Sequence, residues 1–220
     1  MPASFLFDQS LLGYKKMLFI MKESEILNEI EKITEEIKAD PQNESYTKRG
    51  IDPLFLVDPR AKILVVGQAP GRVAEKTRLT WNDRSGDLLR EWMGVSRAEF
   101  YDSGLIGIIP MDFYFPGTSK GGDLPPRTGF AQKWHDPLRE TMPEVELTLL
   151  VGSYACRYYL DLKKSTRLSD VIYDYQRYLP QYLPLVHPSP RNRRWLKTNP
   201  WFEDEVIPVL QERVAGLLGR

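Results

Sequence analysis

Two short segments of the chain combine turn-forming residues with groups that can bind a ligand. The first, GQAPG, covers residues 67–71: Gly67 permits close backbone approach, and Pro70 stiffens the turn while leaving neighbouring N–H groups free. It lacks the Lys-Ser/Thr ending of a phosphate-binding loop. The second, HPSP, covers residues 187–190, where two prolines make a rigid extended turn that presents His187 to a ligand. The alternative for the first segment is a turn with only a structural role. The alternative for the second is a structural histidine that forms hydrogen bonds within the protein.

A basic stretch follows the second segment. Its cationic side chains surround one aromatic residue, and they are Arg191, Arg193, Arg194 and Lys197 beside Trp195. Such a stretch can follow a phosphate backbone, and the aromatic ring can stack on bases or wedge between them. The alternative is a solvated basic loop.

Two carboxylates stand where they could act on a ligand. Asp112 lies in PMDFYF, directly after an apolar run, and Asp83 lies two residues after Trp81. We expect Asp112 to face the ligand crevice, and a surface or turn-capping role is the alternative for each. His135, beside Trp134, is interpreted as structural.

Short apolar runs alternate with helix-like stretches and must position these residues. The runs are residues 63–66, 105–109, 147–151 and 183–186, and the helical candidates are 86–93, 96–103, 130–142, 153–162, 169–179 and 200–218. This alternation predicts an α/β fold of three layers, α/β/α, around a central, mostly parallel four-stranded sheet. Ligands bind outside the carboxyl ends of such strands, where both segments lie.

The N-terminal part of the chain differs from the rest. Residues 22–39 carry isoleucines and leucine at helical spacing and predict an amphipathic surface helix. We therefore divide the chain into an N-terminal extension, residues 1–45, and an α/β domain, residues 46–220. In residues 1–21 the order of charges is wrong for a signal peptide, and no apolar run is long enough to span a membrane.

Composition narrows the class of protein. The 220 residues include 30 basic and 30 acidic ones, so any nucleic-acid surface must concentrate its positive charge locally. The single cysteine, Cys156, excludes an internal disulfide, a four-cysteine zinc site and a cysteine-ligated iron–sulfur cluster. We expect no metal, no cofactor and a reducing, cytoplasmic environment.

The two segments, about 120 residues apart and each closing an apolar run, resemble the signature motifs of the uracil-DNA glycosylase superfamily. RLTWNDRSGDLL, residues 78–89, resembles the iron–sulfur branch segment G-R-P-F-V-G-x-A-G-x-L-L, with Gly86, Leu88 and Leu89 matching. Trp81 then falls where that branch places the aromatic residue that stacks on a flipped uracil. The resemblance covers roughly residues 60–215.

The resemblance implies a role for each matching residue. The base-binding pocket would be lined by Gly67, Gln68, Ala69 and Pro70, with the N–H groups of the non-proline residues facing the base and Trp81 stacking on it. His187 would stabilise the negative charge that develops at uracil O2. The DNA-binding residues would be Ser189 on a phosphate, Arg191 at the intercalating position, and Arg193 and Arg194 beside them.

The chain also departs from its apparent relatives. The cluster cysteines of the iron–sulfur branch are missing, and Gln68 stands where that branch has Glu. Ala69 stands where another branch has an Asp that activates water, and no Asn that reads the uracil edge has a clear match near residues 108–112. Asp112 is the replacement carboxylate that we expect, with His187, to form the catalytic pair.

The resemblance thus implies a DNA glycosylase that flips uracil or a related deaminated base and hydrolyses its N-glycosidic bond, with damaged DNA as partner. One alternative is a catalytically weak or silent protein that binds nucleic acid or a nucleobase on the same fold. Another is an enzyme that acts on a nucleotide or other small molecule.

Overall fold

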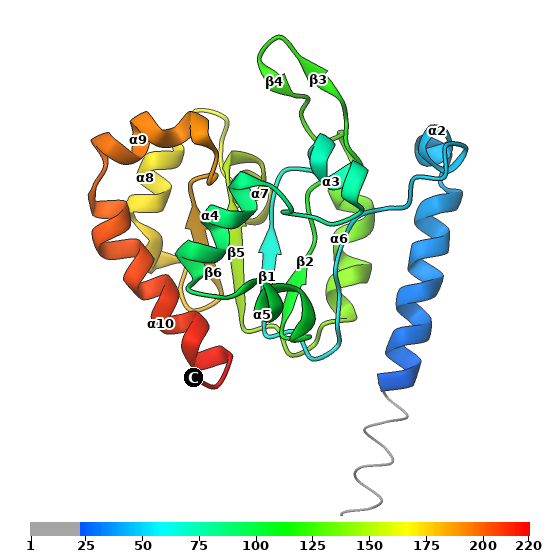
Figure 1. Cartoon of the computed structure of the whole chain (residues 1–220), viewed down its shortest axis with the longest axis horizontal. Helices are drawn as coiled ribbons and strands as arrows, with labels where there is room; N and C mark the ends of the chain where they lie inside the picture. The colour runs from blue at the N-terminus through cyan, green and yellow to red at the C-terminus, as the bar shows by residue number, and fades with distance from the viewer. Residues whose placement is uncertain (1–22) are drawn as a thin grey trace, which may run out of the picture.

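Four parallel strands form the sheet at the centre of the molecule. The computed structural model describes residues 23–220. The strands are β1 (Ile63–Val66), β2 (Ile106–Ile108), β5 (Leu147–Val151) and β6 (Tyr182–Leu185), in the order β2-β1-β5-β6. Each neighbouring pair is parallel, which confirms the expected α/β fold (Figure 1).

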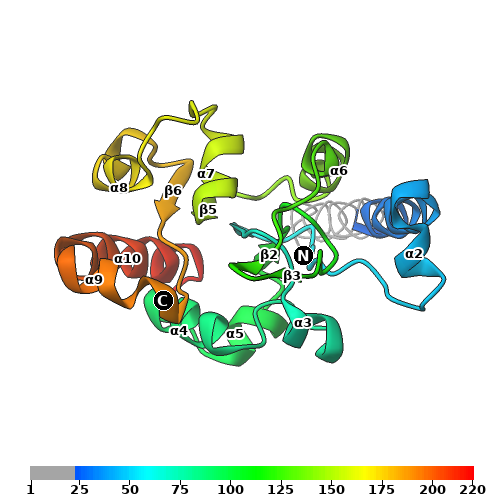
Figure 2. The ribbon, with the colours of Figure 1, turned by 90° about the horizontal axis from the view of Figure 1, so that it is seen from above.

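Helices cover both faces of this sheet, as Figure 2 shows. Along β1, Ile63 and Val65 join the apolar cluster beneath α4 (Arg84–Met93) and α10 (Ile207–Leu217). Leu64 and Val66 join the cluster beneath α6 (Phe130–Glu140) and α7 (Ser153–Tyr159). Successive side chains of a strand point to opposite faces, so a strand covered on both sides is apolar at nearly every position. This is why the strands lie in largely apolar stretches of the sequence, and the three expected layers are present.

The helical segments lie between and around the strands. The α-helices are α2 (Glu44–Thr47), α3 (Arg72–Thr77), α4 (Arg84–Met93), α5 (Arg97–Asp102), α6 (Phe130–Glu140), α7 (Ser153–Tyr159), α8 (Leu168–Tyr173), α9 (Arg193–Thr198) and α10 (Ile207–Leu217). Single turns of 3₁₀-helix occupy Pro41–Asn43, Tyr175–Arg177 and Pro190–Asn192, and a π-helical turn, Phe202–Val206, precedes α10.

Three features differ from the sequence-based expectation. The α3 and α9 segments are helical, although neither is among the helices predicted from the sequence. Between β2 and α6, where no strand was predicted, the chain forms an antiparallel hairpin made of β3 (Thr118–Ser119) and β4 (Gly122–Asp123). Figure 1 shows this hairpin standing out beyond the sheet. Strands this short carry too few residues for a period-two pattern, so the sequence offered no signal for them.

The expected N-terminal helix covers residues 23–39. Its Ile33 and Ile37 are buried in the α6-side cluster, and Asp40 at its end pairs with Lys133 of α6 at 2.6 Å. The predictions for residues 1–21, and the start of the N-terminal extension, fall outside the described residues. Among the helices of residues 23–220, none is long and apolar enough to cross a membrane.

Candidate active site

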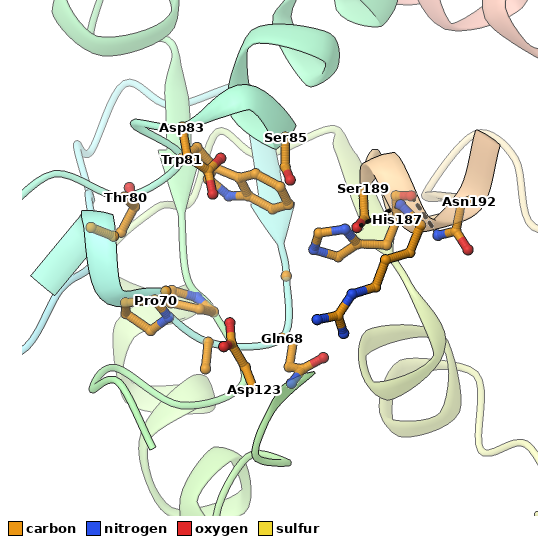
Figure 3. A pocket seen from close by; sticks show the side chains of 16 residues that line it. Gln68, Pro70, Thr80, Trp81, Asp83, Ser85, Asp123, His187, Ser189 and Asn192 are labelled. Atoms are coloured by element: carbon orange, nitrogen blue, oxygen red, sulfur yellow. Dashed lines mark hydrogen bonds between the residues drawn. The ribbon is translucent and has the colours of Figure 1, made fainter. Parts of the chain in front are cut away.

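A cavity of about 390 Å³ lies at the carboxyl ends of β1 and β6. It brings together the two segments singled out from the sequence, and Figure 3 shows the labelled side chains around it. The residues that line it are Gly67, Gln68, Ala69, Pro70, Gly71, Ala74, Thr80, Trp81, Asp83, Ser85, Pro110, Asp123, His187, Ser189, Arg191 and Asn192. The expected base-binding residues therefore share one cavity with His187, Ser189 and Arg191.

The segment after β1 forms one wall of the cavity. Its backbone is tied to the chain that follows β2, because the carbonyl oxygens of Gly67 and Gln68 accept hydrogen bonds from the N–H groups of Met111 and Asp112, at 2.8 and 3.2 Å. A Cβ atom on Gly67 would lie 2.7 Å from Cζ2 of Trp81. Glycine is therefore needed at this strand end so that the indole can approach the backbone.

Trp81 is held in place by its own backbone rather than by a regular element. Its φ of 55° lies in the left-handed region, which is strained for a bulky side chain. Its carbonyl oxygen accepts a hydrogen bond from Arg90 Nη1 at 3.1 Å, and any Cβ on Gly86 would overlap this oxygen. Figure 3 shows the indole across the cavity from Gln68 and Asp123, as an aromatic platform would be.

His187 faces Trp81, with 5.4 Å between the ring centroids and 31° between the planes. Burial lowers the pKa of His187, and the negative charges of Asp83 and Asp123 oppose this shift. Within residues 23–220 neither of its ring nitrogens has a hydrogen-bond partner, whereas its carbonyl oxygen accepts one from Asn192 Nδ2 at 2.8 Å. At neutral pH the imidazole is therefore uncharged, with one N–H to donate into the cavity.

The family model described as the uracil DNA glycosylase superfamily matches residues 55–211, which include both segments and Trp81. The chain belongs to this superfamily. A solution NMR structure of a candidate uracil DNA glycosylase from Methanosarcina acetivorans is similar, at 18% sequence identity and a TM-score of 0.45. The similarity covers 72% of this chain and 94% of that one.

In this member of the superfamily Asp112 does not line the cavity. Its side chain is fully buried, and its two oxygens accept hydrogen bonds from Arg127 Nε and Nη2, both at 2.8 Å. Arg127 in turn donates to Asn43 Oδ1 and to the carbonyl oxygen of Gln42, which joins the N-terminal segment to this pair. The expectation that Asp112 faces the ligand crevice is corrected, because a strand-end position does not determine to which side the carboxylate points.

Ser189 and Arg191 contact the cavity rim, and both side chains already bind protein groups. Ser189 Oγ accepts a hydrogen bond from the N–H of Arg191 at 3.3 Å, which caps the short 3₁₀ turn. The guanidinium of Arg191 donates to the carbonyl oxygen of Gly121 at 2.8 Å, at the tip of the β3–β4 hairpin. Arg191 thus bridges the segment after β6 and the hairpin, in place of the projecting position that the resemblance implied.

Residues 193–197 of the basic stretch lie in α9, whereas Arg191 lies in the preceding 3₁₀ turn. Arg193 and Arg194 are exposed. The aromatic residue is not a free wedge: the indole N–H of Trp195 donates to Ser169 Oγ at 2.8 Å, and its ring packs edge-on against Trp201 and Phe202. Helix formation at 193–198 turns Trp195 toward the protein interior.

The residue that sequence reasoning missed is Asp123. It belongs to β4 and reaches the cavity from the hairpin, where its Oδ2 would lie 3.7 Å from a Cβ atom on Gly71. Asp123 lies in neither of the two segments, and the surrounding GGD sequence gives no local indication of secondary structure. Asp83, which the sequence did suggest, also lines the cavity, but its Oδ1 accepts a hydrogen bond from Gly86 N and caps α4.

A second cavity of about 300 Å³ adjoins the first and shares Gln68, His187 and Asn192 with it. Trp195 lines this second space and not the first. In the described part of the chain, no group of three or more His, Cys, Asp or Glu side chains is arranged to hold a metal ion.

Proposed function

We propose that this protein is a DNA glycosylase that removes uracil or a related deaminated base by flipping it and hydrolysing its N-glycosidic bond. The observation that carries the proposal is the cavity at the ends of β1 and β6, in which Trp81 faces His187, whose ring nitrogens have no hydrogen-bond partner within residues 23–220. Family membership supports the same reaction class. The cavity has the two parts that a flipped base needs, an aromatic platform and a polar donor at its edge.

The chemistry asked of His187 follows from its charge state. When the bond to the base breaks, the electron pair leaves on the base, and a preorganised donor in a water-poor site lowers the barrier. Because burial keeps the pKa of His187 low, the ring is neutral and stabilises this negative charge by donating a hydrogen bond. The backbone N–H groups of Gly67, Gln68 and Ala69 are the further donors that we assign to the base edge.

DNA would meet the rim beside the cavity. We assign phosphate contacts to Ser189, Arg193 and Arg194, which lie at the start of and within the segment after β6. Arg191 would act at the same rim through its contact with the hairpin. The balanced net charge of the chain makes such a local cluster necessary for binding a phosphate backbone. A reducing, cytoplasmic environment remains our expectation from the single cysteine.

The test is single-turnover cleavage of oligonucleotides that carry uracil, hypoxanthine or xanthine, in single- and double-stranded form. We expect an abasic product from at least one of them, detected as strand scission after alkali. If the protein, in excess over the DNA, forms no abasic product from any substrate of the panel, the proposal is overturned.

A catalytically silent binding protein on the same fold is the second candidate. Ala69 supplies no carboxylate where a related branch has one, and the amide nitrogen of Gln68 is used in a hydrogen bond to the carbonyl oxygen of Leu124 at 3.0 Å. Tight, salt-sensitive binding of uracil-containing or abasic DNA without turnover would favour this candidate. Turnover on any of the panel substrates would exclude it.

A further inference from the structure

We propose that Asp123 is the carboxylate that orients and deprotonates the attacking water, an inference that rests on the glycosylase function proposed above. Hydrolysis of a glycosidic bond passes through a transition state with positive charge on the sugar, and a carboxylate near the sugar stabilises that charge and activates water. The motif after β1 carries no acidic residue in this chain. The hairpin brings one to the cavity from elsewhere.

The depth of each lining residue indicates where the sugar of a flipped nucleotide would lie. Gly67, Pro110 and Thr80 are buried and form the deep part of the cavity, whereas Asp83 and Asp123 are exposed at its rim. A flipped nucleotide enters base first, so the base reaches the deep part and the sugar stays at the rim. The carboxylates at the rim are therefore on the sugar side of the bond that breaks.

Of Asp83, Asp112 and Asp123, only Asp123 leaves both carboxylate oxygens without a partner within residues 23–220. Asp112 is buried in its ion pair with Arg127. Asp83 already uses Oδ1 to cap α4. Within residues 23–220 the carboxylate of Asp123 has neither a hydrogen bond nor an ion pair, and it lines the same cavity as His187. His187 and Asp123 thus face the same space.

The hairpin is hydrogen-bonded on both sides of Asp123 by residues that follow β1 and β6. On one side the carbonyl oxygen of Gly121 accepts the hydrogen bond from Arg191 at 2.8 Å. On the other side the carbonyl oxygen of Leu124 accepts the hydrogen bond from Gln68 Nε2 at 3.0 Å. These two hydrogen bonds position the backbone of Asp123 without using its side chain. A reactive group requires such an arrangement, because it must be held in place while its own atoms stay free to react.

The step balances with water as the only co-reactant. The bond between C1′ and the base nitrogen breaks, and its electron pair leaves on the base, where His187 donates a hydrogen bond. The water oxygen bonds to C1′ while its proton passes to the Asp123 carboxylate. That proton then moves to the departed base, so the products are a neutral free base and a sugar with a hydroxyl group at C1′.

The test compares D123N with D83N and with D102N, which removes the same charge from an exposed position outside the cavity. The readouts are the single-turnover cleavage rate on the panel substrate that the wild type cleaves best and the affinity for the same DNA. Removing a general base costs about 10²–10⁴-fold in rate. We expect a loss of at least about 100-fold for D123N, with affinity within about threefold of wild type, and no rate loss for D102N.

A second variant separates chemistry from structure. In D123A, sodium formate should restore part of the rate in a concentration-dependent way, because a small carboxylate can occupy the vacated space, whereas it should not stimulate the wild type. A D123N rate within about threefold of wild type, or no response of D123A to formate, would overturn the assignment of Asp123 while the glycosylase function stood. Absence of cleavage by the wild type itself would overturn both.

Discussion

The cavity rim and the buried cluster behind it use the same residue types for opposite purposes. In the cluster, Asp112 pairs with Arg127, and His135 places Nδ1 2.7 Å from the hydroxyl of Tyr159 and Nε2 3.0 Å from the carbonyl oxygen of Pro110. At the rim, the carboxylate of Asp123 and both ring nitrogens of His187 have no partner within residues 23–220. The chain has two histidines, and one lies in each region.

The difference teaches how to separate structural from chemical groups on this fold. A buried polar group whose donors and acceptors are all hydrogen-bonded stabilises the protein and has no donor or acceptor left for a ligand. A group that is positioned by its backbone but left unpaired can bind or react. Substitutions in the cluster should therefore change stability, and substitutions at the rim should change the rate or DNA binding.

The largest effect is expected from D112N. Removing the charge of a fully buried carboxylate leaves Arg127 without its partner, and breaking a buried pair in this way costs about 3–5 kcal/mol. Urea denaturation should show a lower free energy of unfolding by this amount, while D123N should stay within about 0.5 kcal/mol of wild type. Equal losses for the two variants would erase the distinction between cluster and rim.

The second-largest effect is expected from acid, which should lower the free energy of unfolding by protonating His135 in the buried cluster. Burial lowers the pKa of His135 from 6.5 to about 4, so the unfolded chain binds a proton there more readily than the folded protein. The stability due to the neutral ring is fully present above pH 6.5 and is lost as the pH falls toward 4. The loss amounts to about 3 kcal/mol.

This pH effect is checked by urea denaturation at several pH values, with H135Q as the comparison. Glutamine keeps a donor and an acceptor but does not titrate in this range, so the stability of the variant should fall less steeply between pH 6.5 and 4. Parallel curves for wild type and H135Q would contradict the assignment to His135.

At the rim, H187A should lower the single-turnover rate about 100-fold, which corresponds to about 2.7 kcal/mol of transition-state stabilisation. The variant removes the donor for the leaving base and should leave the free energy of unfolding within about 1 kcal/mol, because the ring nitrogens bind no group of the described protein. An unchanged cleavage rate would remove His187 from the mechanism, and a large loss of stability would move it to the structural class.

The smallest effect concerns the outer rim. R193A/R194A should reduce the slope of log affinity against log salt by about 1 for each arginine and leave the single-turnover rate at saturating enzyme unchanged. The matched control is R60A/K62A, which removes two positive charges just before the amino-terminal end of β1. The cavity lies at the opposite, carboxyl end of this strand. The same change of slope in both double variants would exclude a DNA surface specific to α9.

Local pattern was enough for the core of this protein. The boundaries of β1 and β5 could be read from the sequence alone, because strands buried on both faces are apolar at nearly every position. The positions of Gly67 and His187 followed, since parallel strands bring their carboxyl ends to one edge. The short helices and the hairpin could not be predicted, as their stability comes from tertiary contacts and not from a repeating pattern.

By itself, then, the sequence determined the α/β class, the order of the strands along the chain and the two segments that meet at the cavity. Only the tertiary structure decided which carboxylate faces that cavity. Asp112 and Asp123 lie in the same connection after β2, and the choice depends on long-range partners: Arg127 takes Asp112 into the core, while Gln68 and Arg191 hold the hairpin so that Asp123 stays at the rim. Contacts between residues far apart in the chain leave no local pattern, which is why the side chain that we assign to the chemistry could be found only in the folded molecule.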